Sequence, residues 1–166
     1  MPIEMRISRI ALDPLTNMPI VILTERDGER SLPIWVGLLE ASAIATRLEQ
    51  VETARPMTHD LLKQVIDALG ARVERVTVVN LESNTYFAVV NLVGSHGVEE
   101  IDSRPSDALA LALRTGSPIY VEERVIAQAS QADEGTVEHT LDPEDKDKLA
   151  EFLENLPSEQ FGKYKQ

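Results

Sequence analysis

The densest group of chemically useful side chains directly precedes a long apolar run. Residues 102–107 hold two carboxylates, one arginine and two serines, and residues 108–113 are apolar throughout. Such a run predicts a buried helix that begins near Pro105. A helix N-terminus beside Arg104, Asp102 and Asp107 could bind a phosphate group, or hold a divalent cation that bridges to one. The competing interpretation is a structural ion-pair cluster at the rim of the core.

A second stretch of the chain repeats this arrangement. Residues 54–62 read ARPMTHDLL and residues 103–109 read SRPSDAL. Each places Arg-Pro before a hydroxyl residue and an aspartate, at the start of a helix that ends in glycine. Proline fits the first helical turn, and a hydroxyl group can accept hydrogen bonds from free N–H groups there. An aspartate in the first turn is stabilised by the helix dipole. Stabilisation of a helix N-terminus would therefore be enough to explain Pro105, Ser106 and Asp107.

The elements that must position these residues begin with short strands. Alternating polar and apolar residues predict a strand over 5–12, and the apolar run at 20–23 suits a central strand. The dipeptide Asp27-Gly28 is a hairpin signal that returns the chain through residues 30–36.

Two amphipathic helices are expected next, over residues 38–51 and 58–70. The apolar stripe of the first is Leu38, Ala41, Ile44, Ala45, Leu48 and Val51. The stripe of the second is Leu61, Leu62, Val65, Ile66 and Leu69. Gly70 stands where a C-terminal cap belongs.

The remaining elements give the fold class. Strands are predicted over 72–81, 85–93, 98–102 and 117–123, and the third main helix lies within 101–116. Hairpins and crossovers together predict an α+β (mixed α/β) fold. We expect a compact mixed sheet packed against about three main helices, plus a short C-terminal helix.

The composition of the chain changes after Ser130, where the residues become polar and acidic. Residues 1–130 are expected to form the domain, residues 131–141 an acidic linker, and residues 142–166 a C-terminal helix and tail. Asp142 can cap that helix and Pro143 suits its first turn.

Composition excludes several classes of protein. The absence of cysteine excludes disulfides, zinc–thiolate sites and thiol nucleophiles. No apolar run approaches the roughly 20 residues of a membrane span, and the N-terminus lacks the features of a secretory signal. We therefore expect a cytoplasmic protein without a membrane partner. The net charge of −12 repels phosphate backbones, so binding driven mainly by counterion release is disfavoured.

Four segments of the chain carry a family resemblance: LPIWVGLLEASAIA (32–45), RPMTHDLLKQVIDALGARVERV (55–76), NTYFAVV (84–90) and IDSRPSDALALALRTGSPIYVEE (101–123). In this order and spacing they closely resemble the bifunctional nuclease domain family, a bacterial and plant group described as acting on both RNA and DNA. The resemblance covers about residues 5–130. It implies a compact mixed α/β domain and a nuclease that hydrolyses phosphodiester bonds in RNA or DNA.

Phosphodiester hydrolysis needs an activated water and neutralisation of charge on the phosphoryl oxygens. Without cysteine, the expected route is a divalent metal, Mg²⁺, Mn²⁺ or Ca²⁺, held by carboxylates. The candidate ligands within the resembling segments are Glu40, Asp60, Asp102 and Asp107. Asp102 and Asp107 are also candidates for catalysis, together with His59 as a base and Arg55 and Arg104 as phosphate clamps.

The alternative function is a non-catalytic regulatory or protein-interaction module that keeps the nuclease fold. The acidic balance and the seven aromatic residues, few for binding single strands by stacking, favour that alternative. Trp35 is assigned to the core rather than to a base-stacking platform. A homo-oligomer, with a dimer as the expected state, is a further prediction.

Overall fold

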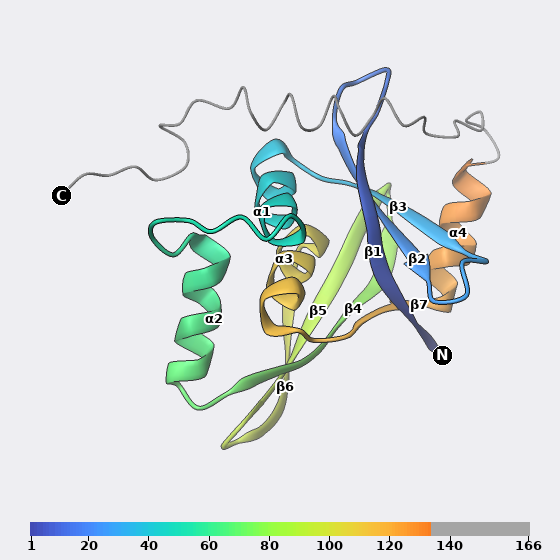
Figure 1. Ribbon diagram of the computed structural model, residues 1–166. Helices are drawn as coiled ribbons and strands as arrows, with labels where there is room; N and C mark the ends of the chain where they lie inside the picture. Colours follow the sequence, from blue (N-terminus) through green and yellow to red (C-terminus); the bar gives the residue numbers. More distant parts are fainter. Residues whose placement is uncertain (134–166) are drawn as a thin grey trace.

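The computed structural model describes residues 1–133, which fold around a single mixed sheet (Figure 1). Its seven strands within that range are β1 (Pro2–Leu12), β2 (Pro19–Glu25), β3 (Ser31–Trp35), β4 (Arg72–Glu82), β5 (Thr85–Gly94), β6 (Gly97–Ser103) and β7 (Ile119–Glu122). The four helices of the same range are α1 (Leu38–Leu48), α2 (Thr58–Ala68), α3 (Pro105–Thr115) and α4 (Glu123–Asp133). The predicted α+β fold is confirmed.

The short strand β7 joins two antiparallel ribbons. The strand order is β3-β2-β1-β7-β4-β5-β6, and β7 runs antiparallel to β1 but parallel to β4. A parallel pair requires a crossover connection, and the chain supplies one through β5, β6 and α3 between β4 and β7. Val121 of β7 is fully buried, as the centre of a covered sheet requires.

The hairpin turns follow from residues that tolerate positive φ. Gly28 has φ 77° and its N–H donates to the carbonyl oxygen of Glu25 at 2.9 Å. The predicted hairpin therefore forms, but Arg26 and Asp27 are the central residues of its turn and Gly28 follows them. Between β4 and β5, Ser83 and Asn84 have φ 49° and 62°. Positive φ at both central residues is the requirement of the type I′ turn, which matches the twist of paired strands.

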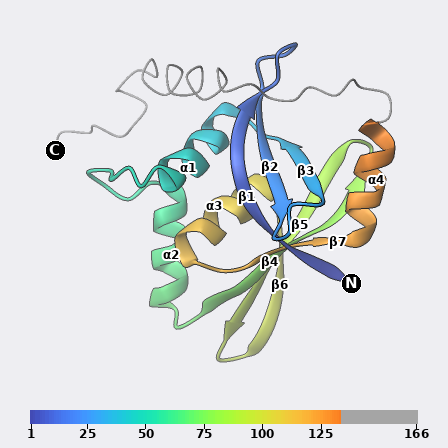
Figure 2. The same cartoon turned by 45° about the vertical axis from the view of Figure 1, so that its right-hand side comes forward.

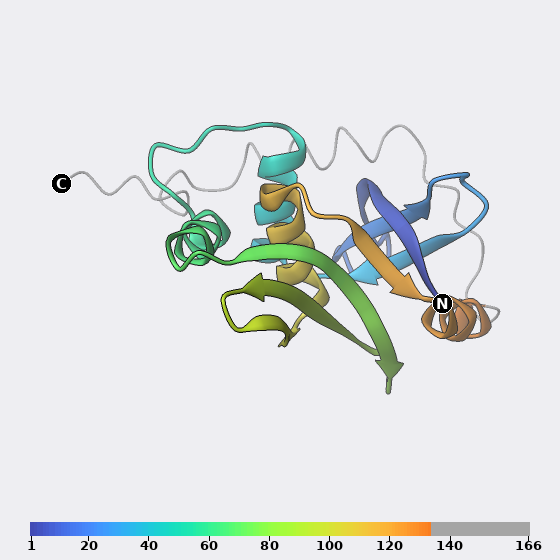
Figure 3. The ribbon, with the colours of Figure 1, turned by 90° about the horizontal axis from the view of Figure 1, so that it is seen from below.

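Helix α3 is the centre of the helical layer. It packs against α1, α2, β4 and β5, and nearly every residue from Pro105 to Ala112 is buried (Figures 1 and 3). This explains why its sequence is apolar on all sides, since a helix covered all round has no solvent face. Both α1 and α2 contact α3, so side chains from all three helices come close together there.

Helix α2 differs from the prediction in how its apolar stripe is used. Of the five predicted stripe residues only Ile66 is buried, whereas Leu61, Leu62, Val65 and Leu69 are 41–79% exposed. The reason is position: α2 lies at the edge of the fold and packs against α3 and β4 through one narrow side (Figure 1).

Helix α4 was missed by the sequence prediction, which left residues 124–130 without an element. Val125, Ile126 and Ala129 are buried in the main core, at the spacing of one helical face. The helix packs against β3, β4 and β7, apart from the other three helices (Figure 2). The expected domain boundary after Ser130 therefore falls inside its last turn.

The C-terminal predictions lie outside the described residues. These are the greater part of the acidic linker, the helix beginning at residue 142 and the tail. No helix among residues 1–133 combines the length and the apolar character needed to cross a membrane.

Candidate functional site

A buried histidine joins α2 to α3. Nε2 of His59 lies 2.9 Å from Oδ1 of Asp107, and the His59 side chain is only 11% exposed. His59 is the second residue of α2 and Asp107 the third of α3, so each stands in the first turn of its helix. The two helix starts thus meet at a histidine–carboxylate pair.

Arg104 extends this pair to α1. Its Nε donates to Oδ2 of Asp107 at 2.8 Å, and its Nη1 donates to Oε1 of Glu40 at 2.9 Å. We call the four residues Glu40, His59, Arg104 and Asp107 the His59 cluster. The Arg104 side chain is 64% exposed, so the cluster is open to solvent at Arg104 and buried at His59.

Asp107 is held in its ionised form. Burial alone would raise its pKa, but the hydrogen bonds from Arg104 and His59 outweigh burial and leave the pKa below its ordinary value. An ionised Asp107 is an acceptor only, so the bond to His59 requires a proton on Nε2. In neutral His59 the lone pair is then on Nδ1, which makes Nδ1 the basic atom of the ring.

Gly37 makes room for Glu40. It precedes α1, and a Cβ at this position would lie closer to Oε2 of Glu40 than real Cβ atoms come to any neighbour. Glycine therefore allows the Glu40 carboxylate to fold back beside the helix start, where Oε1 reaches Arg104.

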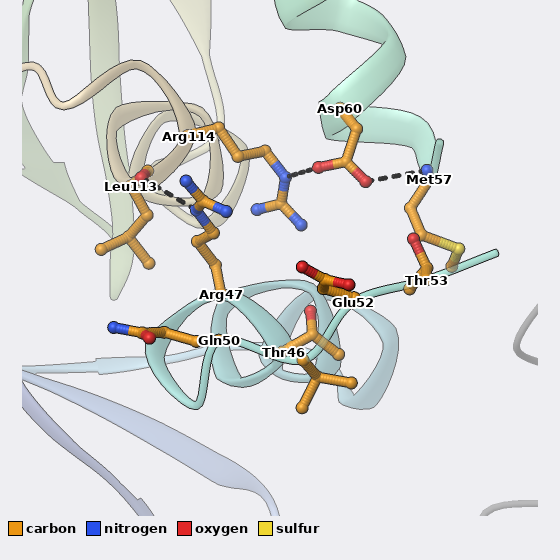
Figure 4. A pocket seen from close by; sticks show the side chains of 10 residues that line it. Thr46, Arg47, Gln50, Glu52, Thr53, Met57, Asp60, Leu113 and Arg114 are labelled. Atoms are coloured by element: carbon orange, nitrogen blue, oxygen red, sulfur yellow. Dashed lines mark hydrogen bonds and ion pairs between the residues drawn. The ribbon is translucent and has the colours of Figure 1, made fainter. Parts of the chain in front are cut away.

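A second ion pair joins α2 to the other end of α3. Nε of Arg114 donates to Oδ1 of Asp60, and the backbone N–H of Met57 donates to Oδ2 of Asp60 at 2.9 Å (Figure 4). Burial would raise the pKa of Asp60, and the bonds from Met57 and Arg114 lower it below its ordinary value. Arg114 is buried, so removal of Asp60 would leave an uncompensated charge where α2 packs on α3.

Two adjoining cavities lie over these ion pairs. The first, of about 320 Å³, is lined by all four residues of the His59 cluster and by Ser42, Thr46, Thr53, Met57, Thr58 and Arg114, among others. We call it the site cavity. The second, of about 730 Å³, is lined by Thr46, Arg47, Gln50, Val51, Glu52, Thr53, Met57, Asp60, Leu113 and Arg114. We call it the arginine pocket (Figure 4).

The structure separates Asp102 and Arg55 from the other predicted site residues. Asp102 is exposed on the edge strand β6, opposite Val89 of β5, and does not line either cavity. Arg55 is exposed in the loop between α1 and α2 and has no ion pair among residues 1–133. The expectation that Asp102 and Asp107 form one cluster is therefore wrong, because β6 directs the chain away before α3 begins.

The predicted metal ligands do not form a metal-holding group. Within residues 1–133 no three His, Asp or Glu side chains are grouped as a metal site would need. Asp60 contacts Arg114 and Met57, while Glu40 and Asp107 contact Arg104. A cation entering the site cavity would have to compete with a guanidinium group for each carboxylate, so the residues as arranged do not fit a metal.

The motif residues do not cap their helices as predicted. Arg104, not a serine, occupies the N-cap position of α3 and makes no side-chain cap bond there. The carboxylate of Asp107 contacts Arg104 and His59. Pro105 begins α3 and Asp107 lies in its first turn, as predicted. At the start of α2 the carboxylate of Asp60 accepts from the N–H of Met57. Asp107 thus has one local partner, Arg104, and one long-range partner, His59.

Sequence reasoning missed Arg47 and Arg114, which line the arginine pocket. Arg114 offered a usable signal: it is the one charged residue within the last two turns of an otherwise apolar helix. A charged side chain on a helix that must be buried requires a partner. Trp35 was assigned to the core and is 47% exposed, with its Nε1 donating to Oδ2 of Asp13 at 3.1 Å.

Comparison with known proteins identifies the relatives of this fold and site. The bifunctional nuclease domain matches residues 21–134. An uncharacterized protein of Mycobacterium tuberculosis is 40% identical over 162 residues, which cover 95% of this chain and 97% of that protein. Bifunctional nuclease 2 of Oryza sativa subsp. japonica is 35% identical over 108 residues, 62% of this chain and 33% of that protein.

A second plant protein called a bifunctional nuclease is also similar to this chain. Bifunctional nuclease 1 of Arabidopsis thaliana is 31% identical over 109 residues, 63% of this chain and 34% of that protein. The domain match spans α1, α2 and α3 and so includes the whole His59 cluster. The chain belongs to the bifunctional nuclease domain family.

Proposed function

We propose that this protein hydrolyses phosphodiester bonds in RNA, DNA or both, at the site cavity. The observation that carries the proposal is the His59 cluster: a buried histidine bonded to an ionised carboxylate, beside an exposed arginine, in a cavity of about 320 Å³. Membership of a family that includes plant proteins called bifunctional nucleases supports it.

The proposed base is Nδ1 of His59. Asp107 accepts the Nε2 proton, keeps the imidazole in one tautomer and stabilises the positive charge that forms when Nδ1 takes a proton from water. The water oxygen then forms a bond to phosphorus, the bond to the leaving oxygen breaks, and solvent protonates that oxygen. Asp107 acts on the substrate only through His59, as a positioning residue.

The proposed phosphate contact is Arg104. Its Nε and Nη1 are engaged with Asp107 and Glu40, whereas Nη2 has no hydrogen-bond partner among the described residues. An exposed guanidinium held in place by two carboxylates is suited to neutralise charge on a phosphoryl oxygen. Glu40 would fix the orientation of the guanidinium.

The role of a divalent metal stays a prediction. Mg²⁺, Mn²⁺ or Ca²⁺ would supply charge neutralisation at the phosphoryl oxygens. Cleavage measured with each ion and with excess chelator tests this. Activity that persists at full rate in chelator would show that the hydrolysis needs no divalent metal.

Purified protein, freed of host nucleases, should be tested on labelled RNA and DNA with His59→Gln as the diagnostic variant. Glutamine keeps polarity but cannot serve as a base near neutral pH, so the rate should fall about 100-fold or more. His96→Gln is the matched control, because His96 is exposed in the turn between β5 and β6. Equal rates for His59→Gln and the wild type would reject the proposal.

The second candidate is an interaction module without catalytic activity. The specific observation in its favour is the exposed apolar side of α2, formed by Leu61, Leu62, Val65 and Leu69. Folded wild-type protein that cleaves neither nucleic acid under any ionic condition would favour this function. The predicted dimer, measured by sedimentation equilibrium, is compatible with both.

A further inference from the structure

The arginine pocket has no role in the proposed hydrolysis. We propose that it binds a phosphate group of the nucleic-acid strand, next to the phosphate that is cleaved in the site cavity. The strand assignment rests on the proposed function; the phosphate site itself does not. Residues Arg47 and Arg114 would supply the contacts.

Arg114 is a fixed cation at the inner wall of this pocket. Its side chain is 5% exposed, its Nε donates to Asp60 and its Nη1 donates to the carbonyl oxygen of Ala110 at 2.9 Å. These two bonds leave Nη2 without a partner among the described residues. A buried guanidinium held on two sides loses little further freedom when it binds a ligand.

Arg47 brings a second cation into the same cavity. Its Nε reaches only the carbonyl oxygen of Leu113, at 3.5 Å, and no carboxylate of residues 1–133 lies within 4.0 Å of its guanidinium. Figure 4 shows both guanidinium groups directed into the pocket. Asp60 lines the same pocket, pairs with Arg114 and attracts Arg47 from beyond ion-pair distance. Arg47 is therefore the cation that a bound phosphate would pair with, and the partner-free Nη2 of Arg114 would add a hydrogen bond.

The geometry favours a phosphate group over a monatomic anion such as chloride. Guanidinium groups present paired N–H donors whose spacing matches phosphate oxygens, and two such groups can address different oxygens of one phosphate. A pocket of about 730 Å³ has room for a phosphate with its attached sugar. It shares Thr46, Thr53, Met57 and Arg114 with the site cavity, so one strand can pass from one to the other.

Glu52 limits the affinity of the pocket. Its exposed carboxylate faces the two arginines in Figure 4, and it forms no ion pair with either of them. Like charge repels phosphate, so Glu52 should weaken binding. This makes Glu52→Gln a variant that distinguishes an anion site from a merely structural group of arginines.

Calorimetric titration of the full-length chain tests the phosphate site. Inorganic phosphate and two thymidine dinucleotides, with and without a 5′-phosphate, are titrated into protein carrying His59→Gln, so that cleavage does not interfere. We expect the dinucleotide with the 5′-phosphate to bind more tightly than the one without it. Arg47→Gln should reduce this gain in affinity by a factor of about ten or more. Glu52→Gln should tighten binding. Arg26→Gln, an equal charge change in an exposed hairpin turn, should have little effect.

Three results would overturn the proposal. Equal loss in Arg47→Gln and Arg26→Gln would show a nonspecific charge effect. Weaker binding in Glu52→Gln would contradict an anion site. Inorganic phosphate that binds through Arg47, with no gain from the 5′-phosphate, would reject the strand assignment. Cleavage by wild-type protein is measured separately, so failure of the proposed hydrolysis would leave these binding results intact.

Discussion

At the scale of single residues, Asp107 is the link between the buried and exposed ends of the His59 cluster. One of its oxygens accepts from His59 and the other from Arg104. Asparagine has nearly the same shape but no charge, and one side of its amide can only donate. It can therefore satisfy one of the two partners but not both.

We predict that Asp107→Asn lowers the rate of nucleic-acid cleavage about 100-fold or more, because the tautomer and the charge of His59 lose their support. The free energy of unfolding should change by no more than about 2 kcal/mol. Rates on labelled substrate and urea denaturation of the same preparation measure both.

Asp102→Asn is the matched control for this variant. Asp102 is exposed on β6, outside both cavities, so its substitution should leave rate and stability unchanged. If Asp102→Asn lowered the rate as much as Asp107→Asn, the separation of the two carboxylates seen here would be contradicted.

The pair of Asp60 with Arg114 predicts a specific response to acid. The pKa of Asp60 is below its ordinary value, so folding favours the ionised form. Its contribution to the free energy of unfolding is fully present above the ordinary aspartate pKa of about 3.9, and is lost as pH falls through the lower folded value.

Asp60→Asn should therefore lower stability by about 1–3 kcal/mol near neutral pH, and by less as the pH approaches the folded pKa. Chemical denaturation of the variant and the wild type at several pH values below about 5 measures the difference. A difference between them that stays constant with pH would show that the carboxylate charge contributes nothing.

At the scale of elements, α2 has two sides with different tasks. One side carries His59, Asp60 and Ile66 towards α3 and β4, and the adjoining side leaves four apolar residues exposed. Three helix starts, those of α1, α2 and α3, thereby contribute to one site. The orientation of α2 decides whether His59 reaches Asp107.

We predict that Ile66→Ala lowers the free energy of unfolding by about 2–4 kcal/mol, because Ile66 is 8% exposed and packs in the core. Leu61→Ala removes a side chain of similar size that is 55% exposed and should cost less than about 1 kcal/mol. Urea denaturation measures both. A reversed order would mean that α2 presents its other side to the fold.

At the scale of the whole molecule, charge is distributed unevenly. The chain carries 28 acidic and 16 basic residues, whereas each of the two cavities is lined by two arginines and two carboxylates. Long-range repulsion of a nucleic acid is therefore opposed by short-range contacts at the cavities. The partner of such a surface would be a short or flexible strand that presents single phosphates, rather than a long duplex that follows a basic face.

The limit of the folding unit is set by α4. A chain that ends at Asp133 keeps Val125, Ile126 and Ala129 in the core, so it should unfold cooperatively. A chain that ends at Glu122 loses these three residues. Burial of one Val or Ile side chain contributes roughly 1.5–3 kcal/mol, a large part of a typical total stability of about 5–15 kcal/mol.

Circular dichroism and thermal unfolding of the two truncated chains measure this prediction. The shorter chain should lack a cooperative transition. A cooperative transition in the chain that ends at Glu122 would show that α4 is an accessory to the fold.

The seven strands, three of the four helices within residues 1–133 and the fold class could be predicted from the amino-acid sequence. Every strand of the structure and helices α1, α2 and α3 follow from hydrophobic periodicity, turn residues and helix-start residues that act within a few positions of one another. Helix α4 was not predicted because its three buried residues are interspersed with polar ones. It also begins directly after β7, with no turn residue to mark its start.

The partners of the site residues could not be predicted from the sequence, because they depend on how the helices pack. His59 and Asp107 are 48 positions apart, Arg104 and Glu40 are 64 apart, and Arg114 and Asp60 are 54 apart. Periodicity shows which face of a helix is apolar, but not how that helix is rotated and placed against another. Asp102 and Asp107 are neighbours in sequence and parted in space because a strand ends and a helix begins between them. The exposed stripe of α2 has the same origin: the pattern gives an apolar side, and packing decides whether anything covers it.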